Sequence, residues 1–264
     1  MRSQRLPLNL NDLTALILTS NEEANIGRTL EALRWVARVV IVDSQSTDRT
    51  LEITRTFSNV QIYQRQFDAF AEQCNFGLTR MTTEWVLSLD ADYVLTPELQ
   101  EELKRLRPPQ DVRGYSIVFD YCVFGRPLRN SILPPRTVLY RRTGARYRNE
   151  GHGHRVAIDG KLEGLRGHIW HDDRKPLSRW IQSQDRYTEI EAAYLLKTPE
   201  DKLNRPDKIR KWIFVAPLIM PIYLLLGRGL ILEGWTGWYY AFQRTIVEML
   251  LSLRLLEQKL GDGE

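Results

Sequence analysis

Two carboxylates separated by one small residue, Asp90-Ala91-Asp92, end the apolar stretch 85–89, which we expect to be a buried strand. Side chains of an extended chain alternate with a period of two, so Asp90 and Asp92 are expected to point the same way. Together they provide oxygen ligands for a hard divalent cation that also holds phosphates. Because Asp is also common in solvated turns after strands, the motif alone does not decide between a metal site and a turn.

Two earlier expected strands also end in polar clusters. Strand 13–18 is followed by T-S-N-E-E at 19–23, and strand 39–42 by D-S-Q-S-T-D at 43–48. Helical patterns separate the strands, and this alternation implies βαβ units in a mostly parallel sheet. Ligands of such sheets bind beyond the carboxyl ends of the strands, so three clusters at one edge predict a site.

The chain lacks the glycine-rich phosphate loops of common nucleotide-binding proteins. Neither G-x-G-x-x-G nor G-x-x-x-x-G-K-[ST] occurs. The sequence therefore does not favour a dinucleotide-binding protein or an ATP hydrolase. The first half instead predicts a nucleotide-type pocket without a phosphate loop.

Composition is that of a folded protein with a mildly basic charge. The 264 residues are 27% charged and 43% hydrophobic, enough for one large α/β domain with an appendage. A net charge of +4 and a pI near 9.1 suit anionic ligands or a membrane surface, but they do not predict a nucleic-acid partner. The two cysteines, Cys74 and Cys122, show no disulfide framework, and the first apolar run is too short for a signal peptide. We therefore expect a reducing compartment and no export.

All four histidines fall within twenty residues, and they allow an alternative of a different class. His152 and His154 lie two residues apart, and His168 and His171 lie three apart. Imidazoles at such spacings can share a zinc ion, as in a zinc-dependent hydrolase. That alternative leaves the three strand-end clusters without a role. A third alternative is an inactive membrane-bound scaffold, which the intact D-A-D disfavours.

The C-terminal section is the most apolar. Residues 212–226 carry no charge, include Pro217 and Pro221, and follow basic residues at 208–211. A spanning helix needs about 20 apolar residues, so an interfacial or re-entrant segment fits better, while a buried helical hairpin stays open. Aromatic residues at 235–240 resemble an interfacial belt, and a long amphipathic helix continues to about residue 259. We expect a membrane surface to be contacted through residues 208–240.

Three motifs in this order resemble glycosyltransferase family 2, the inverting GT-A class that uses nucleotide sugars. They are T-x-N-E-E-x-N-I at 19–26, V-D-S-x-S-T-D-x-T at 42–50 and W-V-L-x-L-D-A-D at 85–92. The lipopolysaccharide-core β-1,4-glucosyltransferase branch is the most similar, with further likeness at 67–75 and in L-E-G-W-T-G at 232–237. Residues 110–200 match more loosely. Tyr93 follows the D-A-D where that branch commonly has an acidic residue.

The resemblance implies a fold and an activity. Residues 10–200 are expected to form a GT-A (Rossmann-like) mostly parallel sheet flanked by helices, with a nucleotide-sugar half at 10–100 and an acceptor half at 110–200. Residues 205–264 are expected to form a helical, membrane-interfacial appendage on the inner face of the plasma membrane. The expected reaction moves a hexose from a nucleotide-diphosphate sugar, with UDP as the expected nucleotide, to a cell-envelope glycan or lipid-linked acceptor. A polyprenyl phosphate is the alternative acceptor, although such enzymes often add full transmembrane helices.

The resemblance also implies roles for individual residues. Asp92 would ligate Mg²⁺ or Mn²⁺ bound to the diphosphate, and Asp90 would lie near both the ribose and the metal. Asp43 would contact the base or ribose. The nucleotide-sugar pocket as a whole draws on all three motifs: Thr19, Asn21, Glu22, Asp43 and Asp90.

An inverting transfer also needs a base that takes the proton from the acceptor hydroxyl. Family members usually supply Asp or Glu from a later segment, and residues 148–154 occupy that place here without the usual E-D pair. Glu150 is the first candidate for the base and His152 the second. Asp172 and Asp173 are the next candidates.

Overall fold

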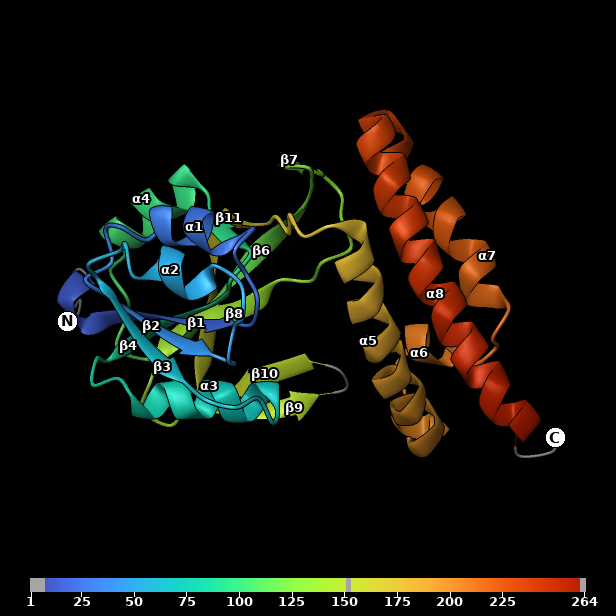
Figure 1. The fold of residues 1–264 in the computed structure, drawn as a ribbon, viewed down its shortest axis with the longest axis horizontal. Coiled ribbons are helices and arrows are strands. Elements are labelled where there is room, and N and C mark those ends of the chain that lie inside the picture. The colour runs from blue at the N-terminus through green and yellow to red at the C-terminus, as the bar shows by residue number, and fades with distance from the viewer. Residues whose placement is uncertain (1–7, 151–152, 262–264) are drawn as a thin grey trace. The chain divides into compact units, whose positions relative to one another are not determined.

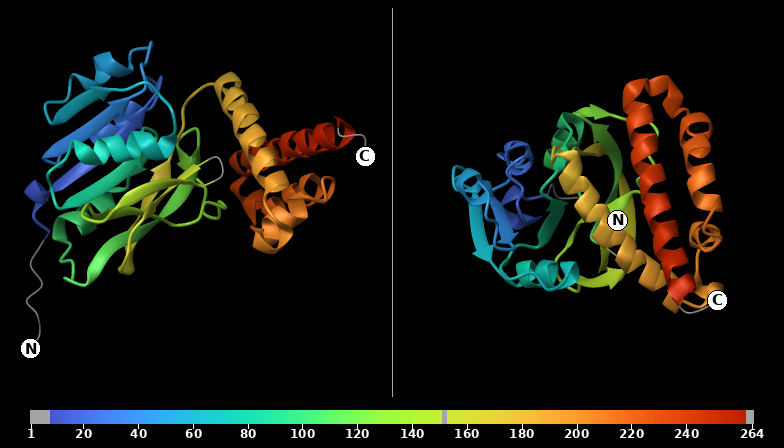
Figure 2. Two further views of the ribbon diagram at one scale, coloured as in Figure 1. Left: turned by 90° about the horizontal axis from the view of Figure 1, so that it is seen from below. Right: turned by 45° about the vertical axis from the view of Figure 1, so that its right-hand side comes forward.

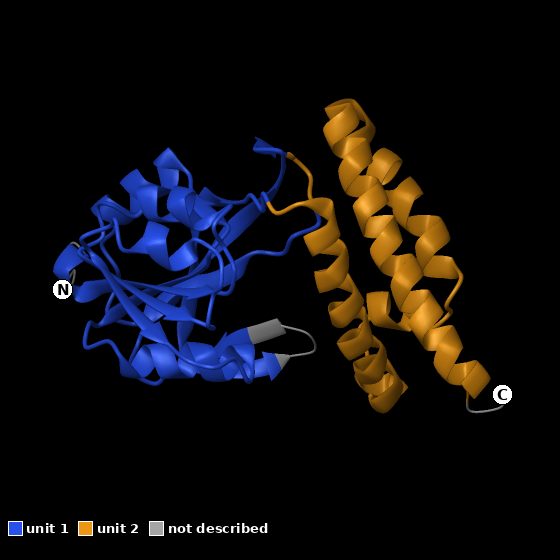
Figure 3. Cartoon of the chain, viewed as in Figure 1, with its two compact units in different colours: residues 1–127, 132–174 blue, residues 128–131, 175–264 orange. Residues whose placement is uncertain are grey.

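The computed structural model describes residues 8–150 and 153–261, except the side chains of residues 150, 153 and 154. The chain divides into two compact units (Figure 3). Unit 1 takes residues 1–127 and 132–174, and unit 2 takes residues 128–131 and 175–264. Unit 1 contains the strands of the protein, whereas unit 2 is built from helices.

The first four long strands of unit 1 lie parallel in the order β3-β2-β1-β4. They are β1 (Leu13–Thr19), β2 (Arg38–Asp43), β3 (Val60–Gln64) and β4 (Trp85–Asp90). The side chains of β1 and β2 are almost all buried, as expected for parallel strands covered on both faces.

Helices cover the two faces of these strands separately (Figure 1). Residues 13, 15 and 17 of β1 share a core with α1 (Ile26–Glu31) and with α4 (Pro97–Arg105). Leu16, between them, belongs to the core formed with α3 (Phe70–Thr79). The short helix α2 (Thr50–Thr54) lies beside α1. Strand alternation therefore divides the apolar residues between two cores.

The sheet continues from β4 in the order β8-β6-β11-β5, which makes it a mixed sheet. The added strands are β5 (Tyr93–Leu95), β6 (Val112–Val123), β8 (Arg136–Arg141) and β11 (Lys161–His171), and β7 (Arg126–Pro127) pairs with β6. β8 runs antiparallel to both neighbours, β11 runs parallel to β6, and β5 runs antiparallel to β11. The expected α/β sheet flanked by helices is confirmed.

The connection between β4 and β5 forces this sheet to curl. Only Ala91 and Asp92 separate the two strands in sequence, yet β5 stands four places from β4 in the sheet order. Three Cα–Cα steps reach about 11 Å at most, whereas four strand spacings measure about 19 Å across a flat sheet. The sheet therefore bends until β5, and the end of β11 beside it, return to the carboxyl end of β4.

A separate two-stranded ribbon packs beside α3. It consists of β9 (Arg146–Glu150) and β10 (Gly153–Ala157) in antiparallel pairing. The Asn75 side chain donates to the Tyr147 carbonyl at 3.1 Å and accepts from the Tyr147 N–H at 2.9 Å. The Asn149 side chain accepts from the N–H of Ala71 in the first turn of α3. These bonds fix the Asn149 end of the ribbon beside the start of α3, which follows the carboxyl end of β3.

Unit 2 contains the expected long C-terminal helix and three further α-helices. They are α5 (Leu177–Lys197), α6 (Arg205–Arg210), α7 (Val215–Ile222) and α8 (Trp235–Gly261), and α8 packs against both α5 and α7 (Figure 2). Helix α5 therefore belongs to the helical unit, and the division falls at residue 174 rather than near the expected 200. No helix within residues 8–150 and 153–261 has the length and apolar character needed to cross a bilayer.

The packing of α4 on β11 depends on Gly167, and this yields a prediction about stability. A Cβ at Gly167 would lie 2.5 Å from the Leu99 Cα, where backbone cannot move easily. We expect Gly167→Ala to lower the free energy of unfolding of unit 1 by about 2 kcal/mol. Gly164→Ala on the same strand is the control, because its nearest neighbour is 3.9 Å away. Urea denaturation followed by circular dichroism measures both, and equal midpoints for the two variants would contradict the packing assignment.

Candidate functional site

Asp43 fixes the loop after β2 against the end of β1. Its carboxylate accepts from the Thr19 hydroxyl at 2.8 Å and from the hydroxyl and N–H of Ser46 at 2.5 and 2.9 Å. The Asp43 side chain is fully buried, so these bonds satisfy both oxygens inside the protein. Two of the residues assigned to the nucleotide pocket, Thr19 and Asp43, are thus brought into direct contact.

Asn21 and Glu22 extend this cluster from the first loop to the second. Asn21 adopts a left-handed backbone conformation (φ +55°), which Asn tolerates better than most residues. Its side-chain oxygen accepts from the Thr47 N–H at 2.8 Å, and its N–H donates to Ser46. The Glu22 N–H donates to the Thr50 hydroxyl at 2.7 Å. The two polar loops therefore form one hydrogen-bonded rim, and their contact with a nucleotide stays a prediction.

Asp92 lies against His171 at the end of β11. The Asp92 Oδ2 and the His171 Nε2 are 3.0 Å apart, and the Asp92 carbonyl accepts from the Asp172 N–H at 3.0 Å. The Tyr93 ring packs edge-on against the imidazole of His171 with centroids 5.1 Å apart. Burial and the nearby charge of Asp90 raise the pKa of the Tyr93 hydroxyl, which accepts from Arg136 at 3.3 Å. Tyr93, the departure from the family pattern, thus lies near the Asp90 carboxylate and packs against His171, the partner of Asp92.

The charge state of His171 is set by two opposing effects. Burial lowers the pKa of His171, but the charge and hydrogen bond of Asp92, with the charge of Asp90, raise it more. The net result is a pKa above the ordinary value for histidine. The sequence singled out His171 only as part of the histidine cluster, and its role beside Asp92 follows from the pairing of β11 with β5.

The side chains at this point fit a divalent cation that is coordinated partly by the protein and partly by phosphate oxygens. A carboxylate oxygen and an imidazole nitrogen are already adjacent at Asp92 and His171. Among the described residues, no three His, Cys, Asp or Glu side chains form a closed metal cage. An ion held by one or two protein groups completes its coordination with phosphate oxygens and water, as Mg²⁺ commonly does.

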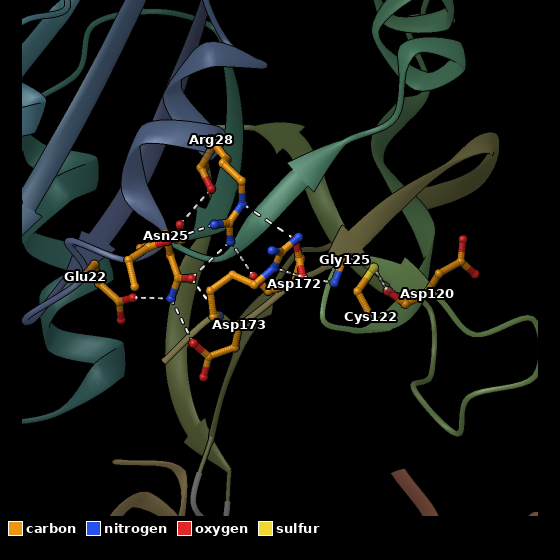
Figure 4. Close-up of polar contacts among 12 residues, drawn as sticks. Glu22, Asn25, Arg28, Asp120, Cys122, Gly125, Asp172 and Asp173 are labelled. Atoms are coloured by element: carbon orange, nitrogen blue, oxygen red, sulfur yellow. Dashed lines mark hydrogen bonds and ion pairs between the residues drawn. The ribbon is translucent and has the colours of Figure 1, made fainter. Parts of the chain in front are cut away.

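Asn25 joins the first loop to the chain that follows His171 (Figure 4). Its side-chain NH₂ donates to Glu22 at 2.9 Å and to Asp173 at 2.8 Å. Its side-chain oxygen accepts from the Arg174 N–H at 2.8 Å and from Arg28 at 3.1 Å. The residue is fully buried, and all of its amide hydrogen-bonding groups are used. The hydrogen-bonded rim of the first two loops and the end of β11 are therefore held together.

Asp172 and Asp173, the candidate bases ranked after Glu150 and His152, take part in this hydrogen-bond network. Asp172 is buried, and its carboxylate accepts from Arg174 at 2.7 Å and from the Gly125 N–H at 3.2 Å, with Arg28 at 3.5 Å (Figure 4). A carboxylate held this way is poorly placed to take a proton from a substrate. Glu150 ends β9, but its side chain is outside the described part of the chain, as is all of His152. The identity of the base stays a prediction.

The zinc-hydrolase alternative is not supported by the described histidines. The Nδ1 of His168 bonds to the Asp120 carboxylate at 2.8 Å, whereas His171 bonds to Asp92. The two residues are three positions apart on β11, so their side chains leave opposite faces of the strand. His152 and the side chain of His154 lie outside the described residues.

Comparison with known proteins was made at three levels. Residues 14–160 match the family model described as Glycosyl transferase family 2. The lipopolysaccharide core biosynthesis glycosyltransferase LpsC of Rhizobium meliloti is 27% identical over 251 residues, covering 87% of this chain and 89% of that protein. The uncharacterized glycosyltransferase RP128 of Rickettsia prowazekii is 24% identical over 234 residues, covering 83% and 80%.

Among solved structures, S. aureus TarS 1–349 in complex with UDP-GlcNAc is similar in fold. The TM-score is 0.50 with 15% sequence identity, and the match covers 94% of this chain and 92% of that chain. At this identity the likeness concerns the fold alone.

The contact between Asp92 and His171 predicts a measurable shift in protonation. Asp92→Asn removes the negative charge that raises the pKa of His171, whereas the burial that lowers this pKa remains. We therefore expect the pKa of His171 to fall below its wild-type value. NMR titration of the metal-free protein measures this midpoint. Because protonation of His171 is favoured in the wild type, the imidazolium signal should persist to higher pH there than in the variant. An unchanged midpoint would contradict the contact.

Proposed function

Because the chain belongs to glycosyltransferase family 2, we propose that it transfers a hexose from a nucleotide-diphosphate sugar to a cell-envelope glycan or lipid-linked acceptor, with inversion at the anomeric carbon. It is a glycosyltransferase by family. The adjacency of Asp92 and His171 beside the rim formed by Thr19, Asn21, Glu22 and Asp43 carries the donor assignment. Family membership also sets the zinc-hydrolase alternative aside.

We propose a UDP-sugar as the donor and Mg²⁺ or Mn²⁺ as the cation. TarS, which shares the fold, was crystallised with UDP-GlcNAc. In this chain Asp92, with Asp90 and His171 beside it, would hold the cation, and the rim would hold the nucleoside. When bound, such an ion stabilises the negative charge that develops on the leaving diphosphate.

The residues around the site keep its ligands in place during the reaction. The Tyr93 ring packs against His171, and the buried Asn25 fixes the end of β11 relative to the first loop. Such preorganisation avoids reorientation as charge develops on the diphosphate. The acceptor hydroxyl would attack from the face opposite the leaving group, with Glu150, or His152 after it, taking the proton.

The donor site predicts a metal-dependent gain in stability on ligand binding. We expect UDP-glucose with Mn²⁺ to raise the melting temperature of the wild type, because a ligand that binds only the folded state stabilises it. Asp92→Asn should lose most of this shift and reduce sugar transfer by about 100-fold or more. Asp120→Asn is the matched control, since Asp120 also contacts a histidine, His168, 2.8 Å away. Equal shifts in both variants and the wild type would overturn the metal assignment.

We also propose that the protein binds a membrane surface at the inner face of the plasma membrane through residues 208–240. Large apolar side chains of this segment are exposed: Trp212, Phe214, Leu218, Ile222, Leu226, Leu232 and Trp235, from 61% to 89%. A buried hairpin would have hidden them. Six cations and one carboxylate, the buried Asp207, fall between residues 202 and 228, which suits anionic lipid headgroups.

The apolar surface continues along α8 beyond residue 240. Trp235, Phe242, Ile246, Met249, Leu253 and Leu260 recur at helical spacing and are 41% to 87% exposed. The opposite face of α8 is buried within unit 2 through residues such as Ala241, Glu248 and Leu251. An exposed apolar area this extensive is unusual for a soluble monomer and fits an interfacial helix.

The exposed apolar side chains predict lipid binding that charge substitution removes. Leu232→Glu with Trp235→Glu should lower binding to phosphatidylglycerol-containing vesicles at least about tenfold, since each buried side chain contributes about 2 kcal/mol. Vesicle flotation measures the bound fraction. Leu162→Glu, at an exposed apolar residue of unit 1, is the control and should float like the wild type. Unchanged flotation of the double variant would count against membrane binding. So would a dimer in lipid-free solution that the same substitutions dissociate.

A further inference from the structure

A half-exposed polar cluster on β6 and β11, formed by Asp120, His168 and Trp170, has no part in the donor site. The Nδ1 of His168 and the Oδ2 of Asp120 are 2.8 Å apart, and their side chains are 42% and 18% exposed. Trp170 stands directly opposite Asp120 in the pairing of the two strands. Because side chains alternate along a strand, all three residues share one face of the sheet.

The other face of the same two strands belongs to the core of unit 1. Ile169 and Phe119 pair with each other between these residues, and both are buried there. His171 leaves β11 on the same side as Ile169 and contacts Asp92. The polar cluster therefore lies on the face of β11 opposite to the proposed cation site.

The polar cluster has hydrogen-bonding groups that the protein leaves unused. The Nδ1 of His168 is directed at Asp120, and its Nε2 has no hydrogen-bond partner within residues 8–150 and 153–261. The indole N–H of the half-buried Trp170 has none in that part of the chain either. A neutral imidazole that donates its Nδ1–H to a carboxylate offers Nε2 as an acceptor. A donor, an acceptor and an aromatic surface thus lie together.

These groups match a neutral sugar ring better than an ion. Sugar hydroxyls both donate and accept hydrogen bonds, as the His168 Nε2 and the Trp170 N–H require, and the C–H face of the ring packs against an indole. The Asp120 carboxylate repels a phosphate group. No third His, Cys, Asp or Glu side chain of the described chain joins the pair in a metal site. The cluster therefore favours an uncharged, hydroxylated ligand.

The polar cluster lies near the edge of the sheet where the proposed transfer takes place. Since β8 runs antiparallel to β4 and β6, and β11 parallel to β6, the carboxyl ends of β4, β6 and β11 share one edge. The Gly125 N–H, in the turn after β6, donates to Asp172 beside His171. His168 precedes His171 by three residues, about 10 Å along the strand. A sugar bound to the cluster is therefore too far from the cation site to be the unit that receives the hexose.

We propose that Trp170 and His168, with Asp120 fixing the imidazole, bind a neutral sugar unit of the acceptor beyond the unit that receives the hexose. This inference rests on the proposed sugar transfer and narrows its acceptor to a glycan with more than one sugar unit. A polyprenyl phosphate without sugars would leave the cluster without a ligand.

Binding of neutral sugars tests the proposal. The probes are the methyl glycosides of glucose, galactose, mannose and N-acetylglucosamine, and saturation-transfer NMR measures their dissociation constants. We expect at least one glycoside to bind the wild type and to shift the indole N–H signal that Trp170→Phe removes. Trp170→Leu should weaken binding at least about tenfold, because ring contact and hydrogen bond are lost together. His168→Ala should weaken it about fivefold, as expected for one neutral hydrogen bond.

Trp35→Leu is the matched control for the loss of an indole. Trp35 precedes β2, at the opposite edge of the sheet, and its N–H donates to the Ala32 carbonyl at 2.9 Å. This variant should bind the glycosides like the wild type. The proposal is overturned if no glycoside binds the wild type, if Trp170→Leu and His168→Ala bind like the wild type, or if the control weakens binding equally. Trp170→Phe, which lacks the N–H but keeps a ring, replaces Trp170→Leu if that variant does not fold.

Donor binding separates this proposal from the proposed function. Trp170→Leu and His168→Ala should keep the gain in melting temperature with UDP-glucose and Mn²⁺, because the cluster and the cation site lie on opposite faces of β11. Loss of that gain in both variants would overturn the proposal by showing that they disturb β11 as a whole. Failure of the wild type to bind any nucleotide sugar would overturn the proposed function, whereas the glycoside result reports on the cluster alone.

Discussion

The short link Ala91–Asp92 is the constraint on which the rest of unit 1 depends. Two residues cannot cross four strand positions, so the sheet bends until its last strand returns to the end of β4. The same bend carries the end of β11, and with it His171, to Asp92. The backbone topology by itself therefore brings Asp90 and Asp92 close to the imidazole of His171.

Buried polar groups hold the curled sheet closed. Asn25 uses both amide hydrogens and its oxygen to join the first loop to residues 173 and 174, and the Thr29 hydroxyl donates to the Ala91 carbonyl at 2.6 Å. Unsatisfied polar groups at such depth are costly, so each partner fixes the others. Helix α1 thereby connects the rim of the proposed nucleotide pocket with the proposed cation site.

The two units divide the surface chemistry of the protein between them. Unit 2 exposes apolar side chains along α7 and α8, while the β9–β10 ribbon of unit 1 exposes arginines. The apolar pattern of unit 2 suits the lipid interface proposed for it.

The sequence was enough to predict the strands and helices of the first half of the chain and the sheet edge at which its polar loops meet. The buried strands β1 and β4 follow from their apolar runs, and the helix start at Thr96-Pro97 follows from capping. Parallel strands necessarily place their carboxyl ends together. Thr19, Asn21, Glu22, Asp43, Asp90 and Asp92 could therefore be assigned to one edge without coordinates. Only the tertiary structure decided that β5 returns beside β11, that His171 meets Asp92, and that α5 joins the helical unit. Those outcomes depend on pairing between segments far apart in the chain, for which residue periodicity carries no signal, because many strand orders bury the same apolar faces.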